Sequence, residues 1–259
     1  MQLTVLGCSG SVPAAESPAS GYLVRAGETS VVLDLGNGTF GALQHYLDPF
    51  TLDGLFLSHL HPDHCADVSS LTVYRRYHPH PPPAGALPLY GPPDAADRLV
   101  AAYAPNADDR KLTDLSDIYD FRSYGATARI GPFEVDAVRV EHPCEAYALR
   151  LGYGEHTLVY SGDTGPCPQL VELATGADVL LAEASWPDRP GNPPGIHLSG
   201  REAGEAAASA GVGRLLLTHI PPWTDAERVL TEAKAAFGGP TELVRPGVHY
   251  QTKRCHQEI

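Results

Sequence analysis

The stretch Leu57-Ser58-His59-Leu60-His61-Pro62-Asp63-His64 determines how this sequence is interpreted. It follows the apolar run Gly54-Leu-Phe-Leu57, which predicts a buried strand. Residues two apart in an extended chain face the same side, so we expect His59 and His61 to be able to bind one metal ion together. Pro62 then turns the chain, which would place Asp63 and His64 at the start of the next helix, facing a neighbouring position.

The side-chain types in this stretch point to metal chemistry. Imidazole nitrogens and carboxylate oxygens are the ligands that zinc and related first-row divalent ions take in proteins. A single histidine here would be interpreted as a solvated loop residue. Three histidines and an aspartate at this spacing favour a metal site instead.

Four further residues stand at the ends of expected strands. His142 follows Val135–Val140, Asp163 lies in Tyr160-Ser-Gly-Asp-Thr-Gly165, His219 ends Leu215-Leu-Leu-Thr-His219, and Asp34 lies in Val31-Val-Leu-Asp-Leu-Gly36. Together with the histidine-rich stretch, they make the sequence resemble the metallo-β-lactamase-fold hydrolases over about residues 2–250. In that family the match to Asp34 supports the ligand loop from outside the metal shell.

The resemblance implies a site for two divalent metal ions. It assigns His59, His61 and His142 to the first ion, assigns Asp63, His64 and His219 to the second, and places Asp163 between both. Zinc is the expected metal, with Mn²⁺ or Fe²⁺ as alternatives for the same ligands. Two such ions promote hydrolysis by activating water and neutralising charge on the substrate.

Asp163 and two later residues narrow the reaction that the resemblance implies. True β-lactamases of the family commonly have Cys at the place of Asp163, so a β-lactamase is disfavoured, whereas glyoxalase-type members share all the ligands. Glu183 ends the expected strand 178–182, and His197 lies in Gly195-Ile-His-Leu-Ser199. This pair resembles the phosphodiesterase branch, which includes ribonuclease Z and bacterial cyclic-nucleotide phosphodiesterases.

By that match, Asp63, His197 and Glu183 are the expected catalytic residues. His197 would contact a phosphate oxygen or protonate the leaving alkoxide, and Glu183 would orient it. The simpler interpretation is that His197 only precedes the helix cap at Ser199. A looser resemblance, over Leu6–Val12, Ser17–Leu23 and Ser58–Asp67, is to an actinobacterial group associated with cAMP hydrolysis.

Composition limits the partners. The 259 residues include 18 Lys and Arg against 31 Asp and Glu, a formal net charge of −13, and the lysines are only Lys111, Lys234 and Lys253. Long nucleic acids need many cations on the protein, and the short interval between His142 and Asp163 leaves no room for the basic arm with which ribonuclease Z-like enzymes grip tRNA. A small anionic phosphodiester is therefore the expected substrate.

The remaining sequence predicts a layered α/β protein. Expected strands cover 2–6, 21–26, 30–35, 54–58, 87–90, 133–140, 146–152, 157–161, 178–182, 214–218 and 242–245, and expected helices 39–48, 64–77, 93–104, 166–174, 200–210 and 225–236. Capping boxes are expected at Ser199–Glu202 and Thr224–Glu227. The resemblance implies a single αββα four-layer sandwich over residues 1–259.

We therefore expect a metal-dependent hydrolase that cleaves a 3′,5′-cyclic nucleotide, with cAMP as the first candidate. The alternatives are a ribonuclease Z-type tRNA 3′-processing endonuclease, a thioester or lactone hydrolase, and a non-catalytic metal-binding accessory protein. The five cysteines are widely spaced without a CxxC pair, and neither a signal peptide nor an 18-residue apolar run is present. These features predict a cytoplasmic protein with no membrane contact, and the branch also suggests a homodimer.

Overall fold

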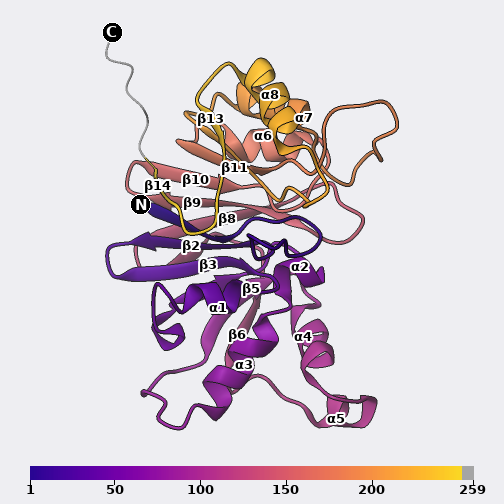
Figure 1. The fold of residues 1–259 in the computed structure, drawn as a ribbon. Helices are drawn as coiled ribbons and strands as arrows, with labels where there is room; N and C mark the ends of the chain where they lie inside the picture. The colour runs from indigo at the N-terminus through magenta and orange to yellow at the C-terminus, as the bar shows by residue number, and fades with distance from the viewer. Residues whose placement is uncertain (253–259) are drawn as a thin grey trace.

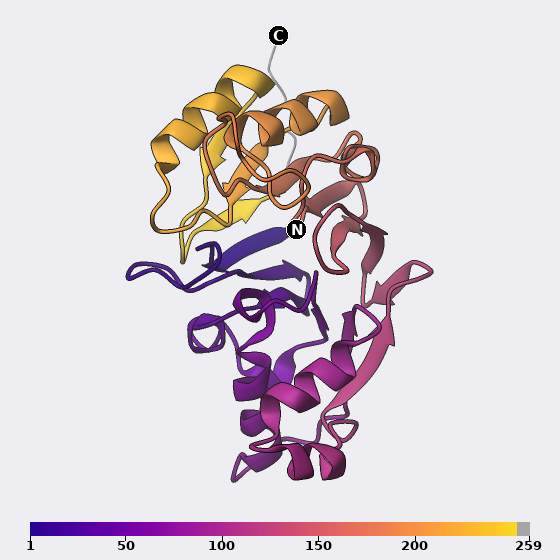
Figure 2. The same cartoon turned by 90° about the vertical axis from the view of Figure 1, so that its right-hand side faces the viewer.

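The computed structural model describes residues 1–252; the end of the expected domain, including Lys253 and Cys255, lies outside the described residues. Two seven-stranded sheets pack face to face, and helices cover the outer face of each sheet (Figure 1). The view turned by 90° shows the same order of layers (Figure 2). The expected αββα four-layer arrangement is confirmed.

The first sheet has the strand order β14-β1-β2-β3-β4-β5-β6. Its strands are antiparallel from β14 to β3 and parallel from β3 to β6. Their bounds are β1 (Gln2–Gly7), β2 (Gly21–Ala26), β3 (Thr29–Leu35), β4 (Gly54–Phe56), β5 (Leu87–Gly91), β6 (Tyr119–Ser123) and β14 (His249–Gln251).

The second sheet has the order β13-β12-β11-β10-β9-β8-β7 and the same division, antiparallel from β7 to β10 and parallel from β10 to β13. Its bounds are β7 (Ala128–Ile130), β8 (Phe133–Arg139), β9 (Tyr147–Tyr153), β10 (His156–Tyr160), β11 (Val179–Glu183), β12 (Leu215–Thr218) and β13 (Thr241–Leu243). Because both sheets contain parallel strands, several strand ends meet at one edge, where polar side chains can converge.

Helices fill the two outer layers. On the first sheet lie α1 (Thr39–Leu43), α2 (Pro62–Cys65), α3 (Val68–Tyr77), α4 (Ala95–Tyr103) and α5 (Ala107–Leu112), with a short 3₁₀ helix at Pro49–Thr51; on the second lie α6 (Pro168–Ala174), α7 (Gly200–Ala210) and α8 (Ala226–Phe237). No helix within residues 1–252 has the length and apolarity needed to cross a lipid bilayer.

The buried apolar residues form three layers. The central one joins the two sheets and includes Leu33 of β3 and Leu181 of β11, both fully buried. The outer two lie between each sheet and its helices, one around Leu71 and one around Leu217. Each sheet packs one face against the partner sheet and its opposite face against helices. The apolar surface removed from water in this way stabilises the fold by about 25 cal/mol per Å².

Several local expectations need correction. The expected helix 39–48 ends at Leu43, as α1. The expected helix 64–77 is two helices, α2 and α3, because the Asp67 backbone N–H bonds the Leu35 carbonyl and its carboxylate accepts from the Phe40 N–H at 2.9 Å. The capping box at Ser199–Glu202 is present. The one at Thr224–Glu227 is not: Asp225 caps α8, and the Thr224 hydroxyl donates to the Ser185 carbonyl at 2.9 Å.

Candidate metal centre

The histidine-rich stretch leaves β4 and passes into α2 at the edge where the strand ends meet. His61 is the extended N-cap residue of α2, and Asp63 and His64 occupy its first turn. His59, Asp63 and His64 are buried, whereas His61 is exposed. The turn is fixed against β3 by Gly36, where an added Cβ would lie 1.9 Å from the Asp63 carbonyl oxygen, so only glycine allows this approach.

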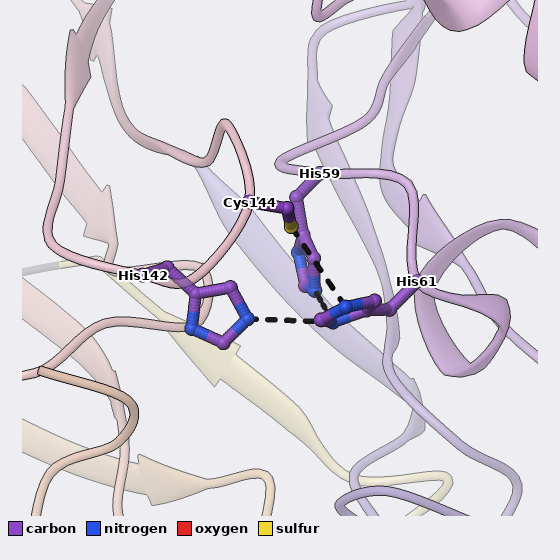
Figure 3. A group of neighbouring side chains, drawn as sticks. All are labelled: His59, His61, His142 and Cys144. Carbon is purple, nitrogen blue, oxygen red and sulfur yellow. Dashed lines mark hydrogen bonds between the residues drawn. The ribbon is translucent and has the colours of Figure 1, made fainter.

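The first group of ligand atoms comes from His59, His61 and His142 (Figure 3). His59 Nε2 lies 3.0 Å from His61 Nδ1, and His142 Nε2 lies 3.3 Å from the same atom. Three imidazole nitrogens from two separate segments thus converge on one point. Cys144 belongs to the same cluster of side chains, with its Sγ 3.8 Å from His61 Nε2.

The second group consists of Asp63, His64, Asp163 and His219, all buried. His64 Nε2 lies 3.2 Å from Asp163 Oδ1, and His219 Nε2 lies 3.3 Å from Asp163 Oδ2. Asp63 Oδ2 is 3.5 Å from His64 Nε2. The four side chains therefore surround a second point.

Asp163 connects the two groups. Its Oδ2 lies 3.3 Å from His219 Nε2 in the second group and 3.7 Å from His59 Nε2 in the first. A carboxylate at this place can offer an oxygen to each of two neighbouring ions. All seven residues that the resemblance assigned to metal are thus brought together, in the two sets that it implied.

Unpartnered buried atoms show that these residues suit metal ions. His64 Nε2, His219 Nε2 and Asp163 Oδ1 are buried and have no hydrogen-bond partner. Such atoms are costly in a protein interior unless something satisfies them. Because the three atoms point toward one another and their chemistry is that of first-row divalent ligands, two ions fit this donor set.

The outer nitrogens of four histidines are held by fixed oxygens. His64 Nδ1 donates to Asp34 Oδ2 at 2.8 Å, and His142 Nδ1 donates to the Ile196 carbonyl at 2.8 Å. His59 Nδ1 lies 3.1 Å from Ser58 Oγ, and His219 Nδ1 lies 2.9 Å from Ser20 Oγ. Such outer partners fix the tautomer, so that the inner nitrogen presents its lone pair to a metal.

Asp34 is buried at the position that the resemblance gave it, outside the ligand shell. Its carboxylate accepts from the Ser58 N–H at 2.7 Å, from the Ser58 hydroxyl at 2.7 Å and from the Tyr160 hydroxyl at 2.7 Å, besides His64. It therefore ties β3, the histidine stretch and β10 together.

Backbone strain is concentrated at the same place. Asp34 has φ 57° and His219 has φ 56°, a left-handed conformation that is unusual for residues other than glycine. Strain of this kind costs about 1–3 kcal/mol per residue and persists only where the surroundings enforce it. Gly10 packs directly on His219, since an added Cβ would lie 2.4 Å from the His219 carbonyl oxygen.

Without a metal ion, the electrostatics of the second group favour a neutral imidazole at His219 and a protonated one at His64, whose Nε2 proton a metal ion would replace. Burial lowers the pKa of His219 to about 4. Burial also opposes charge on His64, but the carboxylates of Asp163 and Asp34 outweigh it and raise its pKa well above the usual value. The pocket thus concentrates negative charge that a divalent ion would balance.

The expected catalytic pair lies beside the two metal groups. Glu183 ends β11 and is fully buried; its Oε1 accepts from His197 Nδ1 at 2.8 Å and from the Thr164 N–H at 2.8 Å. Its Oε2 accepts from the Ser185 hydroxyl at 3.0 Å. Since His197 Nδ1 is engaged, Nε2 is the nitrogen left for a substrate.

The two members of the pair have shifted pKa values. Burial raises the pKa of Glu183 to about 7. Burial opposes charge on His197, but Glu183 overcomes it and raises the pKa of His197 to about 9. An imidazolium held beside a carboxylate is suited to proton donation.

Sequence reasoning missed two neighbours of the ligands. Ser20 contacts His219 across the two sheets, and Cys144 stands beside His61. Cys144 had a weak signal, two residues after His142 in His142-Pro-Cys144. The signal at Ser20 was weaker still, because a serine before a glycine is typical of any turn.

Comparison with known proteins identifies the family and the fold of the chain. The family model of the beta-lactamase superfamily domain matches residues 29–220. An uncharacterised protein of Mycobacterium leprae is 54% identical over 251 residues, which cover 95% of this chain and 87% of that protein. A ribonuclease Z of Myxococcus xanthus is 28% identical, covering 95% of this chain and 96% of its own.

The similarity extends to a solved structure. The probable metallo-hydrolase YhfI of Bacillus subtilis is 31% identical over 254 residues, which cover 95% of this chain and 98% of YhfI. The crystal structure of YhfI, a metallo-beta-lactamase fold protein, matches with a TM-score of 0.84 over 96% of this chain and 99% of that one. Fold and family are therefore shared along nearly the whole chain.

Proposed function

The chain belongs to the beta-lactamase superfamily, in its ribonuclease Z-like branch, and from that premise we propose that it is a phosphodiesterase that hydrolyses 3′,5′-cyclic nucleotides, with cAMP as the first candidate. Its family makes it a metal-dependent hydrolase. The bond that it cleaves is the subject of the proposal.

The observation that carries the proposal is the contact between His197 and Glu183 beside the metal groups. His197 Nδ1 bonds Glu183 at 2.8 Å and lies 3.9 Å from Asp163 Oδ2. A phosphodiester has a poor leaving group, a sugar alkoxide, that needs a proton or a hydrogen-bond donor as the P–O bond breaks. An activated thioester has much less need of such a donor.

Each residue has a defined task in this proposal. His59, His61 and His142 would hold one ion, Asp63, His64 and His219 the other, with Asp163 between them; when bound, the ions supply the Lewis acidity that activates water and neutralises charge on phosphate. His197 Nε2–H faces the leaving oxygen and gives it a proton as the P–O bond breaks. Glu183 keeps His197 oriented and charged.

A ribonuclease Z-type endonuclease is the second candidate, favoured by the 28% identity to a protein of that name. Against it, the segment from His142 to Asp163 consists of a short loop, the hairpin β9–β10 and the turn that bears Asp163, with no protruding arm. The chain's net charge of −13 also disfavours a substrate with many phosphates. A non-catalytic role is disfavoured because all seven ligand positions are filled.

One substrate panel tests the proposal. Zinc-loaded protein is assayed with cAMP, bis(p-nitrophenyl) phosphate, precursor tRNA and a thioester, and its metal content is measured in parallel. We expect the largest kcat/KM with cAMP. A larger value with precursor tRNA would select the ribonuclease, and a larger value with the thioester would refute phosphodiester hydrolysis.

The His197→Ala variant tests the carrying observation. We expect metal content to stay unchanged and kcat to fall about 10²- to 10⁴-fold, the usual contribution of a positioned proton donor. Glu183→Gln should lower kcat by a smaller factor, since the imidazole remains. Loss of metal in the His197→Ala variant would show that His197 acts as a ligand instead.

A further inference from the structure

A cavity of about 360 Å³ opens beside His197. One wall is the segment between β11 and α7, which projects beside α7 in Figure 1, and the other is the turn that leads into α8. Among its lining residues are Ser11, Trp186, Arg189, His197, Trp223 and Arg228. Because His197 also contacts Glu183, the cavity adjoins the proposed reaction centre.

Both tryptophans of the chain lie in this one cavity. The Trp186 ring stands edge-on to His197, with ring centroids 5.2 Å apart, and its buried Nε1 has no hydrogen-bond partner. Trp223 is 69% exposed. A large indole left open to water at a cavity mouth indicates a surface that a ligand covers.

The two walls are tied to each other, so the cavity is formed before a ligand arrives. The Thr224 hydroxyl donates to the Ser185 carbonyl at 2.9 Å, and the Asp188 N–H donates to Glu232 Oε2 at 2.6 Å. Arg228 Nη2 donates to the Asp188 carbonyl at 3.1 Å. Preformed cavities of a few hundred Å³ with aromatic walls are typical of sites for small molecules.

Both positive and negative side chains line the cavity, although the chain as a whole has fewer basic than acidic residues. Arg228 is paired with Glu232 at 3.0 Å. Within residues 1–252, the only side chain that the Arg189 guanidinium bonds is the neutral Asn192, at 3.3 Å. The acidic Asp225 also lines the wall, where one of its oxygens accepts from the Arg228 backbone N–H. The guanidinium of Arg189 is therefore available to an anionic or aromatic ligand.

We propose that this cavity is the nucleobase subsite, in which an aromatic base stacks on Trp223 while its phosphate lies at His197 and the metal ligands. The inference rests on the proposed function, because it takes the phosphate to be bound at that centre. It narrows the substrate class: nucleotides are selected over phosphodiesters that have no aromatic base. Base–aromatic stacking is strong and tolerates different bases. We therefore expect the subsite to recognise an aromatic base in general rather than one particular base.

Binding of two matched ligands tests this subsite. Zinc-loaded protein is titrated with 5′-AMP and with ribose 5-phosphate, which share sugar and phosphate and differ by the base, while tryptophan fluorescence is recorded. Because both tryptophans line the cavity, their emission reports its occupation. We expect saturable quenching by 5′-AMP and at least about tenfold weaker binding of ribose 5-phosphate. Equal binding of the two ligands would overturn the proposal.

Variants of Trp223 give the second readout. Trp223→Ala should weaken 5′-AMP binding about tenfold and raise KM for cAMP by a similar factor with little change in kcat, with Trp186 as the remaining reporter. Trp223→Phe keeps an aromatic face and should restore most of the affinity. The control is Tyr77→Ala, since Tyr77 is 65% exposed but lies on α3 against Tyr103; it should bind 5′-AMP as the unaltered protein does.

The outcomes separate this inference from the proposed function. If cAMP is hydrolysed and Trp223→Ala leaves both Kd and KM unchanged, the function stands and the base subsite is refuted. If 5′-AMP quenches the emission and needs an aromatic residue at 223 while no phosphodiester is hydrolysed, the subsite stands and the proposed reaction is refuted.

Discussion

The two groups of metal ligands differ in how they are held. The group of Asp63, His64, Asp163 and His219, which we term the buried group, has four buried members. The group of His59, His61 and His142, which we term the open group, has a buried His59, an exposed His61 and a half-buried His142. Both lie at the same edge of the sheets and share the carboxylate of Asp163.

This difference suggests that the two groups have different roles in holding and exchanging metal. The buried group is fixed by Asp34, by Ser20 and by the left-handed backbone at His219, so its geometry exists before a metal binds. The open group meets solvent at His61, whose Nε2 lies 3.8 Å from the Cys144 thiol rather than against a fixed oxygen. We infer that the buried group holds its ion tightly and that exchange of the ion and arrival of the substrate take place on the open side.

Asp163→Ala should have the largest effect, because it removes the one carboxylate that both groups share. We expect loss of both ions and a fall of phosphodiester hydrolysis to the background rate. Metal analysis after dialysis, together with the hydrolysis assay, measures both. Retention of two ions by this variant would show that the groups are independent of Asp163.

The two groups can be compared directly by measuring the free energy of unfolding of the metal-free His64→Ala and His61→Ala variants. His64→Ala should lower the free energy of unfolding by about 3–5 kcal/mol, because it leaves the buried Asp34 carboxylate without its imidazole partner. His61→Ala should change it by no more than about 0.5 kcal/mol, since the side chain is exposed. Urea unfolding gives both values; equal losses would remove the distinction between the groups.

Asp34→Asn tests the outer support of the buried group. The amide keeps the size of the side chain but weakens its hold on His64, so we expect metal affinity to fall about 10- to 100-fold. Asp120→Asn is the matched control, since Asp120 is an exposed carboxylate paired with Arg122, and it should bind metal as the unaltered protein does. Competition with a chromophoric chelator measures the affinity. An unchanged affinity in the Asp34 variant would contradict the preformed geometry.

Ser20→Ala should have the smallest effect of these. It removes one hydrogen bond to His219, worth about 1 kcal/mol, and should weaken metal binding about fivefold. The chelator competition resolves a change of this size. A loss as large as that of Asp34→Asn would mean that Ser20 is a principal support of the site.

Local signals predicted the regular elements well. Helix α7 spans residues 200–210 as expected, because Ser199 and Glu202 form both halves of a capping box. Strands β6, β7 and β14 were missed, since each is short or polar and depends on its neighbour in the sheet. The cap at Thr224 was assigned wrongly because its hydroxyl is used by the distant Ser185 carbonyl, a contact that spacing does not reveal.

The residues of the candidate site also divide into those that local sequence patterns reveal and those that they do not. The ligands His59, His61, Asp63 and His64 are close in sequence, so their spacing alone indicated a shared task. His142, Asp163 and His219 were placed by resemblance, and the structure brings His142 to the first group and Asp163 and His219 to the second. Ser20 and the cavity of the two tryptophans depend on contacts between distant segments, which a single sequence does not encode in any local pattern.

Metal reconstitution tests the central claim most directly. The protein is stripped with a chelator, Zn²⁺ is added back in measured equivalents per chain, and hydrolysis of cAMP is followed at each step. We predict no hydrolysis without metal and full activity only when about two equivalents are bound, the first at the buried group. Full activity of the metal-free protein would contradict the account.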